Sequence, residues 1–312
     1  MFKILSSGSY LPPLSVSNHD LSSVVDTSDD WIYQRTGIRS RRYSQGEKTS
    51  DLAAKALISA LEKKSIPVSE IDVIILATTT PDISFPSTAC LVQGIVKATN
   101  AFAFDVNAVC SGFVYAMTIA NGIFHSMQNV NRIAVIGADL MTSVLNMNDR
   151  STCVLFGDGA GALILERTIS DSGIISSSLS SNGMKNSLYS DNHGLKMNGS
   201  DVFKYATSHI SSSLMSALSI CGKNPEDLSA LFVHQANKRI IEFISKSLSV
   251  SIDKIPLNID RYGNTSAASI PILFDEVISD NKRHNFNIVN GSLVSFSSAG
   301  SGMTSGSIIV RI

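Results

Sequence analysis

Cys110 is the side chain whose type and position best suit nucleophilic chemistry. It lies in the stretch FDVNAVCSGFVYAM, where a strand-like apolar run gives way to a small corner and then to a long apolar segment. A thiol at the start of a buried helix lies at the positive end of the helix dipole, which predicts a lowered pKa and a reactive thiolate. Taken alone, a free cysteine is more often an inert part of the core. Cys110 is therefore a candidate nucleophile only if suitable partners converge on it.

His234 and Asn264 are the candidate partners. His234 ends the apolar run ALFVH and precedes QANKRIIEFISKSL, whose isoleucines follow helical spacing, so the imidazole is expected at the carboxyl end of a strand, where α/β proteins carry their chemistry. Asn264 lies in RYGNTSAASIP, a context that also suits a turn or a helix cap. The remaining histidines lie in polar or loop-like surroundings: His19, His125, His193, His209 and His284.

The elements that must position these residues alternate along the whole chain. Apolar runs such as DVIILATT, AFAFDV, RIAVIGA and GSIIVRI are separated by segments of helical character. This alternation predicts an α/β layered fold. The runs are apolar on both faces, which is typical of strands covered by helices above and below.

The sequence also repeats its own plan. ALEKKSIPVSEIDVIILAT is matched by ALSICGKNPEDLSALFVHQ, CSGFVYAMTIANGIF by NTSAASIPILFDEVI, and FGDGAGALILER by GSGMTSGSIIVR, in the same order. Three ordered pairs indicate a duplicated half. We place the join near residue 170, which gives an N-terminal half 1–170 and a C-terminal half 171–312. A pseudo-twofold axis between such halves brings Cys110 to Asn264, with His234 beside them.

The composition excludes several classes of protein. A formal net charge of -1 gives no field that favours nucleic acid or an acidic membrane. The N-terminal apolar run is too short for a secretory signal, and no segment approaches the roughly 20 apolar residues of a membrane span, so we expect a soluble, cytoplasmic protein. The four cysteines form no CxxC pair, so neither a metal site nor a disulfide framework is expected.

Five motifs, in order along the chain, resemble those of the β-ketoacyl-acyl carrier protein synthase III enzymes: DTSDDWIYQRTGIRSRR, DVNAVCSGF, DRSTCVLFGDGAGA, VHQANKRII and DRYGNTSAAS. The resemblance implies a thiolase-like fold, with two similar halves in a layered αβαβα architecture. It also implies an acyltransferase that condenses an acyl-CoA starter, expected to be acetyl-CoA, with malonyl-acyl carrier protein and so initiates fatty acid synthesis. Coenzyme A thioester is then a substrate, and no permanently bound cofactor is expected.

The resemblance assigns roles to individual residues. Cys110 accepts the acyl group, and His234 and Asn264 donate N–H groups to the enolate formed by decarboxylation. A second oxyanion site uses the Cys110 amide and one near Ser301, and Phe85 reaches across a homodimer interface. Lys238 and Arg239 are expected contacts for an acidic carrier protein. Trp31 and Arg150 sandwich the adenine of coenzyme A, and the full set of expected coenzyme A contacts is Thr27, Trp31, Arg35, Arg150, Asn237 and Arg239.

Two glycine-rich stretches each depart from a known motif. The corner AGSGMTSGS departs from the family, in which a glycine triplet, an aromatic residue or leucine, and Thr-Trp-Gly are expected. Serine at position 301 keeps a backbone amide but has a narrower range of φ than glycine, which puts the oxyanion site there in question. GDGAGA leads into a strand and lacks the strand-before, helix-after context of a dinucleotide fingerprint, so no nicotinamide cofactor is expected.

The sequence leaves three alternative functions open. A related condensing enzyme of secondary metabolism would use another starter or acceptor, and a cysteine hydrolase would use the same three residue types but leave Trp31 and Arg150 without a purpose. A binding-only protein is disfavoured by the complete set of three residues. The starter length depends on how Phe85, Phe156, Leu188 and the residues near Met303 pack.

Overall fold

The computed structural model describes residues 1–183, 187–191, 194–280 and 286–312. His193 and His284 therefore lie outside the described residues. Within the described part of the chain, one sheet has five strands in the order β1-β7-β6-β4-β5. β4 pairs in parallel with β5 and β6, whereas β6–β7 and β1–β7 are antiparallel. The strands of this first sheet are β1 (Phe2–Tyr10), β4 (Val73–Ala77), β5 (Phe102–Val106), β6 (Arg132–Asp139) and β7 (Gly159–Arg167).

A second sheet repeats this pairing scheme. The described residues form four strands in the order β11-β12-β13-β8, with β11–β12 parallel and the other two pairings antiparallel. Read from the other edge, β8-β13-β12-β11 has the same sequence of antiparallel and parallel pairings as β1-β7-β6-β4. The strands are β8 (Gly173–Ser180), β11 (Ala230–Val233), β12 (Leu293–Gly300) and β13 (Thr304–Arg311).

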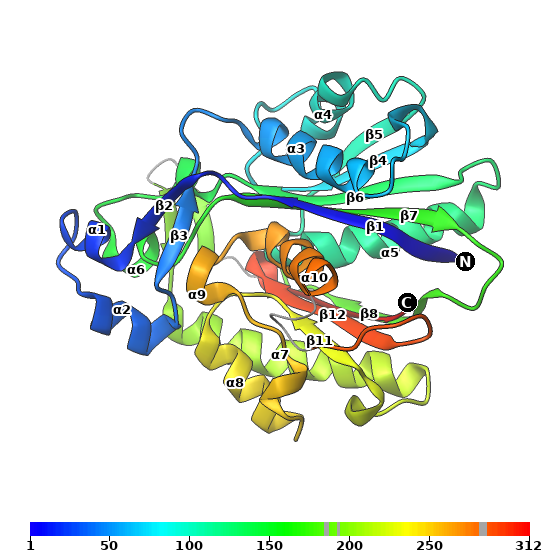
Figure 1. The fold of residues 1–312 in the computed structure, drawn as a ribbon. Coiled ribbons are helices and arrows are strands. Elements are labelled where there is room, and N and C mark those ends of the chain that lie inside the picture. The colour runs from blue at the N-terminus through cyan, green and yellow to red at the C-terminus, as the bar shows by residue number, and fades with distance from the viewer. Residues whose placement is uncertain (184–186, 192–193, 281–285) are drawn as a thin grey trace.

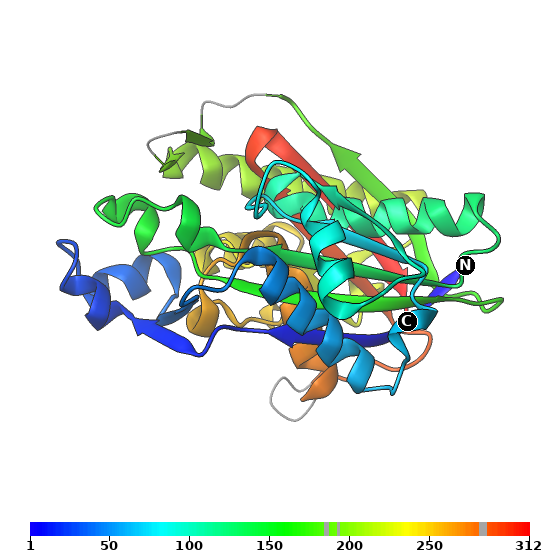
Figure 2. The ribbon, with the colours of Figure 1, turned by 90° about the horizontal axis from the view of Figure 1, so that it is seen from above.

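Helices complete a five-layer αβαβα arrangement, visible edge-on in Figure 1, and Figure 2 shows the molecule from above with α3 and α4 nearest the viewer. α3 and α4 cover the outer face of the first sheet, α5 and α10 lie between the sheets, and α7 and α8 cover the outer face of the second. The predicted thiolase-like α/β fold is thus confirmed. These helices are α3 (Thr49–Glu62), α4 (Thr88–Val96), α5 (Gly112–Ser126), α7 (Gly199–Ile220), α8 (Lys238–Ser247) and α10 (Ser269–Ser279).

The central layer forms the main core because its helices are apolar on nearly every side. Phe113 of α5 and Phe274 of α10 both pack on Phe296 of β12, with ring centroids 6.2 and 5.4 Å apart. Phe232 of β11 completes the cluster at 5.6 Å from Phe296. Aromatic rings of this size bury large areas and contribute strongly to stability. The core therefore fixes the start of α5 and the middle of α10 relative to both sheets.

The smaller elements gather at one end of the molecule, on the left in Figure 1. α2 begins after Ser28, whose hydroxyl accepts a hydrogen bond from the Trp31 amide at 3.2 Å, and ends at Gly37 in the left-handed region. No described helix has both the length and the apolar character required to cross a membrane. These elements are β2 (Leu14–Ser17), α1 (Asn18–Ser22), α2 (Asp29–Thr36), β3 (Ser40–Tyr43), α6 (Arg150–Cys153), β9 (Leu188–Asp191), β10 (Gly194–Met197) and α9 (Ile259–Tyr262).

The packing of α10 against β7 gives a test of the layered core. A Cβ at Gly161 would lie 2.6 Å from the Ile272 amide nitrogen and 2.7 Å from the Pro271 carbonyl carbon, so Gly161→Ala forces two backbones apart. We expect the free energy of unfolding, measured by urea denaturation, to fall by about 2 kcal/mol. Gly94→Ala is the control: a Cβ there meets nothing within 4 Å, and alanine should stabilise α4 slightly. Equal stability of the two variants would contradict this packing.

Candidate active site

A cavity of about 280 Å³ brings the three predicted residues Cys110, His234 and Asn264 together. They come from three different segments: the turn before α5, the end of β11 and the turn after α9. The cavity continues past apolar side chains of α7 and α8 to Trp31 and Arg35 of α2. Its wall also includes Phe156, Leu188, Met197, Val202, Phe203, Tyr205, Ile240 and the corner from Ala299 to Met303.

Cys110 lies in a tight turn between β5 and α5. The turn Val109–Ser111 is a 3₁₀ helix that leads directly into α5, and Val109 has φ of 50°, a left-handed conformation that is rare for a β-branched residue. The Ser298 hydroxyl of β12 donates a 2.8 Å hydrogen bond to the Cys110 carbonyl. A strained backbone persists only where its surroundings determine it, and here the second sheet supplies that support.

The environment of the Cys110 thiol differs from the expected one. The side chain is 6% exposed, and burial raises its pKa to about 12, with a further increase from the Asp139 carboxyl. The Ser266 hydroxyl, 3.6 Å from Sγ, acts in the opposite direction. The prediction of a lowered pKa is therefore wrong, because desolvation outweighs the helix N-terminus. A pKa this high makes the sulfur a neutral thiol at pH 7, which would have to lose its proton in order to act as a nucleophile.

His234 is held as a neutral hydrogen-bond donor. Its Nδ1 lies 2.7 Å from the Ser269 hydroxyl, and that hydroxyl oxygen accepts from the Gln235 amide at 3.4 Å. Donation of the hydroxyl hydrogen to Nδ1 would place the ring proton on Nε2. Burial lowers the pKa of His234 to about 4, so the ring is uncharged at pH 7. A neutral imidazole with its Nε2–H free can donate to an oxyanion without protonating it outright.

Asn264 is fixed by its backbone and by its own side chain. Its amide donates to the Leu155 carbonyl at 2.9 Å, and its carbonyl accepts from Gly157 at 3.0 Å. Gly263, with φ of 63°, makes this approach possible, since a Cβ there would lie 2.7 Å from the Leu155 oxygen. The Asn264 Oδ1 accepts from the Ser266 amide at 2.8 Å. Its Nδ2 group remains as a second N–H donor for the cavity.

The corner 299–304, which departs from the family pattern, packs against the turn that carries Cys110. The left-handed conformations fall on Gly302 and Met303, with φ of 71° and 49°, so serine at 301 does not require a glycine-like backbone. A Cβ at Gly300 would lie 3.0 Å from the Cys110 amide nitrogen. The Thr304 hydroxyl, 3.2 Å from the Ala108 carbonyl oxygen, also ties the corner to this turn. The concern about φ at Ser301 therefore does not apply.

The expected coenzyme A residues are only partly gathered. Trp31, Arg35 and Asn237 line the cavity, whereas Arg150 lies outside its lining with its guanidinium 4.7 Å from the centre of the Trp31 ring. A ring stacked between two flat groups needs roughly 7 Å, twice a normal contact distance. An adenine between Trp31 and Arg150 therefore requires Arg150 to move aside. The Arg150 guanidinium also donates to the Asp26 carbonyl at 2.7 Å.

Thr27, Arg239 and Phe85 also lie outside the lining of the cavity. The Arg239 guanidinium lies 6.0 Å from the ring of Phe203, which does line the cavity. The buried Thr27 hydroxyl finds no hydrogen-bond partner among the described residues. Phe85 is 84% exposed and does not line the cavity of its own chain, whereas the other three residues named for starter length do.

Sequence reasoning missed the residues that hold the site. Asp139, fully buried at the end of β6, accepts from the Thr79 amide at 2.7 Å and the Ala267 amide at 3.0 Å, and burial raises its pKa. Ser266 and Ser269 contact Cys110 and His234 directly. Both serines belong to the motif NTSAAS, but a serine in a turn has no signal that separates this role from an ordinary cap.

A thiol and two neutral N–H donors in one buried cavity of an αβαβα fold define the class of thiolase-fold condensing enzymes. Comparisons with known proteins agree. The profile described as "3-Oxoacyl-[acyl-carrier-protein (ACP)] synthase III" matches residues 104–183, and the one for its C-terminal part matches residues 218–312. The chain belongs to the β-ketoacyl-[acyl-carrier-protein] synthase III family, and it is an acyltransferase.

Individual relatives cover the whole chain. It is 46% identical to the "Beta-ketoacyl-[acyl-carrier-protein] synthase III" of Wolbachia pipientis wMel, over 99% of this chain and 98% of that protein. The crystal structure of 3-oxoacyl-[acyl-carrier-protein] synthase III from Aquifex aeolicus VF5 superposes with a TM-score of 0.96 at 41% identity and covers 100% of both chains. The priming β-ketosynthase of the R1128 polyketide pathway gives 0.92 at 29% identity, over 100% and 96% of the two chains.

The raised pKa of Cys110 predicts its pH-dependent reactivity. Because the thiolate fraction keeps growing below a pKa of about 12, alkylation of Cys110 by iodoacetamide should accelerate about tenfold per pH unit from about pH 7 to pH 10 without levelling. Mass spectrometry of the peptide that contains residue 110 gives the rate. Urea-unfolded protein is the control and should level off near the ordinary cysteine pKa of about 8.5. A plateau below about pH 9 in folded protein would contradict the assigned pKa.

The Ser269 hydroxyl gives a second test. Ser269→Ala removes the partner of Nδ1 and lets the His234 proton occupy either ring nitrogen, so decarboxylation of a malonyl thioester should slow by about tenfold. Nitrogen NMR of the labelled ring should show loss of the single Nε2–H tautomer. Ser279→Ala, at the exposed end of the same helix, is the control and should leave both measurements unchanged. An unaltered tautomer in Ser269→Ala would show that the hydroxyl does not set it.

Proposed function

We propose that this enzyme transfers an acyl group from coenzyme A to Cys110 and condenses it with malonyl-acyl carrier protein, which initiates fatty acid synthesis. Acetyl-CoA is the proposed starter. The observation that carries the proposal is the content of one cavity. A buried thiol shares it with two side chains that we propose as hydrogen-bond donors, His234 through Nε2–H and Asn264 through Nδ2–H. A hydrolase would need a base at this position instead.

In the first step the Cys110 sulfur attacks the thioester carbonyl of acyl-CoA. The new bond is a thioester like the one that breaks, and the thiol proton leaves on coenzyme A, so the exchange is close to balanced in energy. Burial keeps the resting thiol protonated, so the sulfur becomes strongly nucleophilic only as that proton departs. The carbonyl oxygen accepts from the Cys110 amide and from the corner at Ser301.

In the second step malonyl-acyl carrier protein loses carbon dioxide. The electrons of the broken bond form an enolate, whose oxygen accepts from His234 Nε2–H and Asn264 Nδ2–H. The enolate carbon then attacks the acyl group on Cys110 and releases the sulfur as a thiolate, which takes up a proton from solvent to restore the resting thiol. Neutral donors suit this step because a charged imidazolium would protonate the enolate, and burial keeps the pKa of His234 at about 4.

Coenzyme A enters as a substrate along the cavity. Trp31 and Arg150 take its adenine once Arg150 has moved, and Arg35 supplies a cation 4.5 Å from the same ring. Asn237 begins α8 at the cavity wall. The orphan Thr27 hydroxyl and the Arg239 guanidinium complete the set proposed to contact the nucleotide or the pantetheine arm. Lys238 and Arg239 form a cationic edge that fits an acidic carrier protein.

We further propose a cytoplasmic homodimer built from duplicated halves 1–170 and 171–312. β5 is an edge strand, and an unpaired edge with exposed apolar side chains is a common dimer surface. The shared pairing scheme of the two sheets supports the duplication. Large apolar side chains are exposed on or near this edge: Ile83, Phe85, Ile95, Phe102 and Ile119.

The test separates the two half-reactions. Cys110→Ala should abolish transfer of radiolabel from acetyl-CoA to the protein, because no acyl acceptor remains. Asn264→Ala should keep that labelling within about threefold and slow condensation with malonyl-acyl carrier protein about 100 to 1000-fold, because one enolate donor is lost. Labelling of Cys110→Ala on another residue, or equal loss of both steps in Asn264→Ala, would refute the assignment.

A substrate panel distinguishes this proposal from a condensing enzyme of secondary metabolism. Acetyl, branched and longer acyl-CoA starters are compared with malonyl-acyl carrier protein held fixed, and the acceptor is then varied with acetyl-CoA held fixed. The proposal expects acetyl-CoA and malonyl-acyl carrier protein to give the highest kcat/KM. A preference for a different acceptor by tenfold or more, about 1.4 kcal/mol, would favour the alternative.

A further inference from the structure

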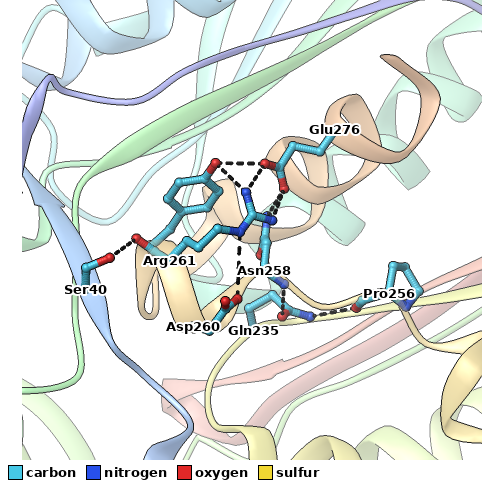
Figure 3. A network of polar contacts seen from close by, with 8 residues as sticks. Ser40, Gln235, Pro256, Asn258, Asp260, Arg261 and Glu276 are labelled. Atoms are coloured by element: carbon cyan, nitrogen blue, oxygen red, sulfur yellow. Dashed lines mark hydrogen bonds and ion pairs between the residues drawn. The ribbon is translucent and has the colours of Figure 1, made fainter. Parts of the chain in front are cut away.

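A buried polar network joins α10 to the short helix α9 that precedes it (Figure 3). Glu276 of α10 is its centre and accepts four hydrogen bonds from residues that the structure describes. Oε1 accepts from Arg261 Nη1 at 2.6 Å and from the Tyr262 hydroxyl at 2.7 Å. Oε2 accepts from Arg261 Nη2 at 3.1 Å and from Asn258 Nδ2 at 2.9 Å. Both carboxylate oxygens are therefore fixed in direction by two donors each.

The Arg261–Glu276 pair is charged and specific in geometry. Burial alone would raise the pKa of Glu276, but the Arg261 hydrogen bonds and charge lower it below its usual value. The two side chains are only 21% and 17% exposed, and the guanidinium meets the carboxylate in the two-pronged manner that fixes orientation as well as distance. Such a pair resists sliding of α9 along α10.

One branch of the network reaches His234. The Asn258 backbone amide donates to Gln235 Oε1 at 3.2 Å, and Gln235 Nε2 donates to the Val233 carbonyl at 2.8 Å. Gln235 is fully buried and directly follows His234. The Asn258 side chain thus contacts the Glu276 carboxylate, and its backbone amide contacts Gln235. Gln235 in turn bonds to the Val233 carbonyl, so Asn258 is linked to both chain neighbours of His234.

The other branch reaches Asn264. Arg261 and Tyr262 are the last two residues of α9, and only Gly263 separates them from Asn264. The Ser40 hydroxyl of β3 donates to the Arg261 carbonyl at 3.0 Å and closes the network from the opposite side (Figure 3). Movement of the α9 backbone away from α10 would break the Arg261–Glu276 contacts and would carry with it the turn that contains Asn264.

We propose that Glu276 and its donors are a positioning unit that holds His234 and Asn264 at one separation, the separation required to bind the enolate of the malonyl substrate. This inference rests on the function proposed above. Cys110 is anchored differently, through Ser298 and through the turn before α5. The unit therefore acts on condensation and not on acylation of Cys110, although it touches neither substrate.

The test measures both half-reactions in Glu276→Gln. The substitution keeps the shape of the side chain but replaces one acceptor oxygen with an NH₂ group that faces a donor. Condensation of pre-acetylated enzyme with malonyl-acyl carrier protein should slow at least about tenfold, since an error near 1 Å in placement costs on the order of 100-fold. Radiolabelling of Cys110 from acetyl-CoA should change by less than about twofold.

Glu166→Gln is the matched control. Glu166 of β7 accepts from Arg132 Nε and Nη2 at 2.9 and 2.6 Å, and these side chains are 20% and 22% exposed, but the pair lies at the far end of the first sheet. Both half-reactions should stay unchanged in this variant. A selective loss of condensation in Glu166→Gln as well would show that any lost ion pair has this effect, and would overturn the proposal.

Two further variants make the test decisive. Arg261→Gln combined with Glu276→Gln should slow condensation no more than Glu276→Gln alone, because residues of one unit are not additive. Tyr262→Phe removes a single donor and should produce the same selective loss at smaller size, about threefold, so it decides the matter if Glu276→Gln fails to fold. Equal loss of both half-reactions in these variants would refute a positioning role. Failure of the unsubstituted enzyme to label Cys110 would refute the proposed function instead.

Discussion

Exclusion of water from the space between the two sheets is the constraint that the site depends on. It acts at once on the Cys110 thiol, the His234 imidazole and the Asp139 carboxyl, and it favours the neutral form of each. A charged nucleophile stored there would be costly. A neutral thiol and a neutral donor cost little until a substrate carbonyl arrives, so the burial that stabilises the fold also sets the protonation states from which catalysis starts.

Desolvation also explains why so many short-range backbone contacts surround the site. A donor that replaces water must already point at the developing charge, because no solvent can reorganise around it. The left-handed residues Val109 and Ser266, and the pinned backbone of Asn264, provide this fixed direction. The aromatic core and Ser298 support the turn that contains Val109, and we place the Glu276 unit behind the turn that carries Asn264. Rigidity at the centre therefore depends on packing and charge several residues away.

Much of this arrangement was predictable from sequence. Alternating apolar runs predict the layers, and the ordered repeats and motifs place Cys110, His234 and Asn264 in segments that a duplicated fold brings together. The pKa of Cys110 was not predictable, since helix position is visible in sequence but depth of burial is not. The contact of Arg150 with Trp31 and the hydrogen bond of Ser269 to His234 are also products of tertiary packing, which joins residues 119 and 35 positions apart.

The placement of these groups on two halves has a chemical consequence. Acylation and condensation need different geometries at one carbon atom, and a single rigid segment cannot be shaped for both. In the proposed mechanism the acyl group is held by the turn before α5, while the enolate donors are held at the ends of β11 and α9. The two sets meet only through small contacts such as that of Ser266 with Cys110. A fold of two packed halves can therefore adjust one step by substitution in one half while the other step keeps its geometry.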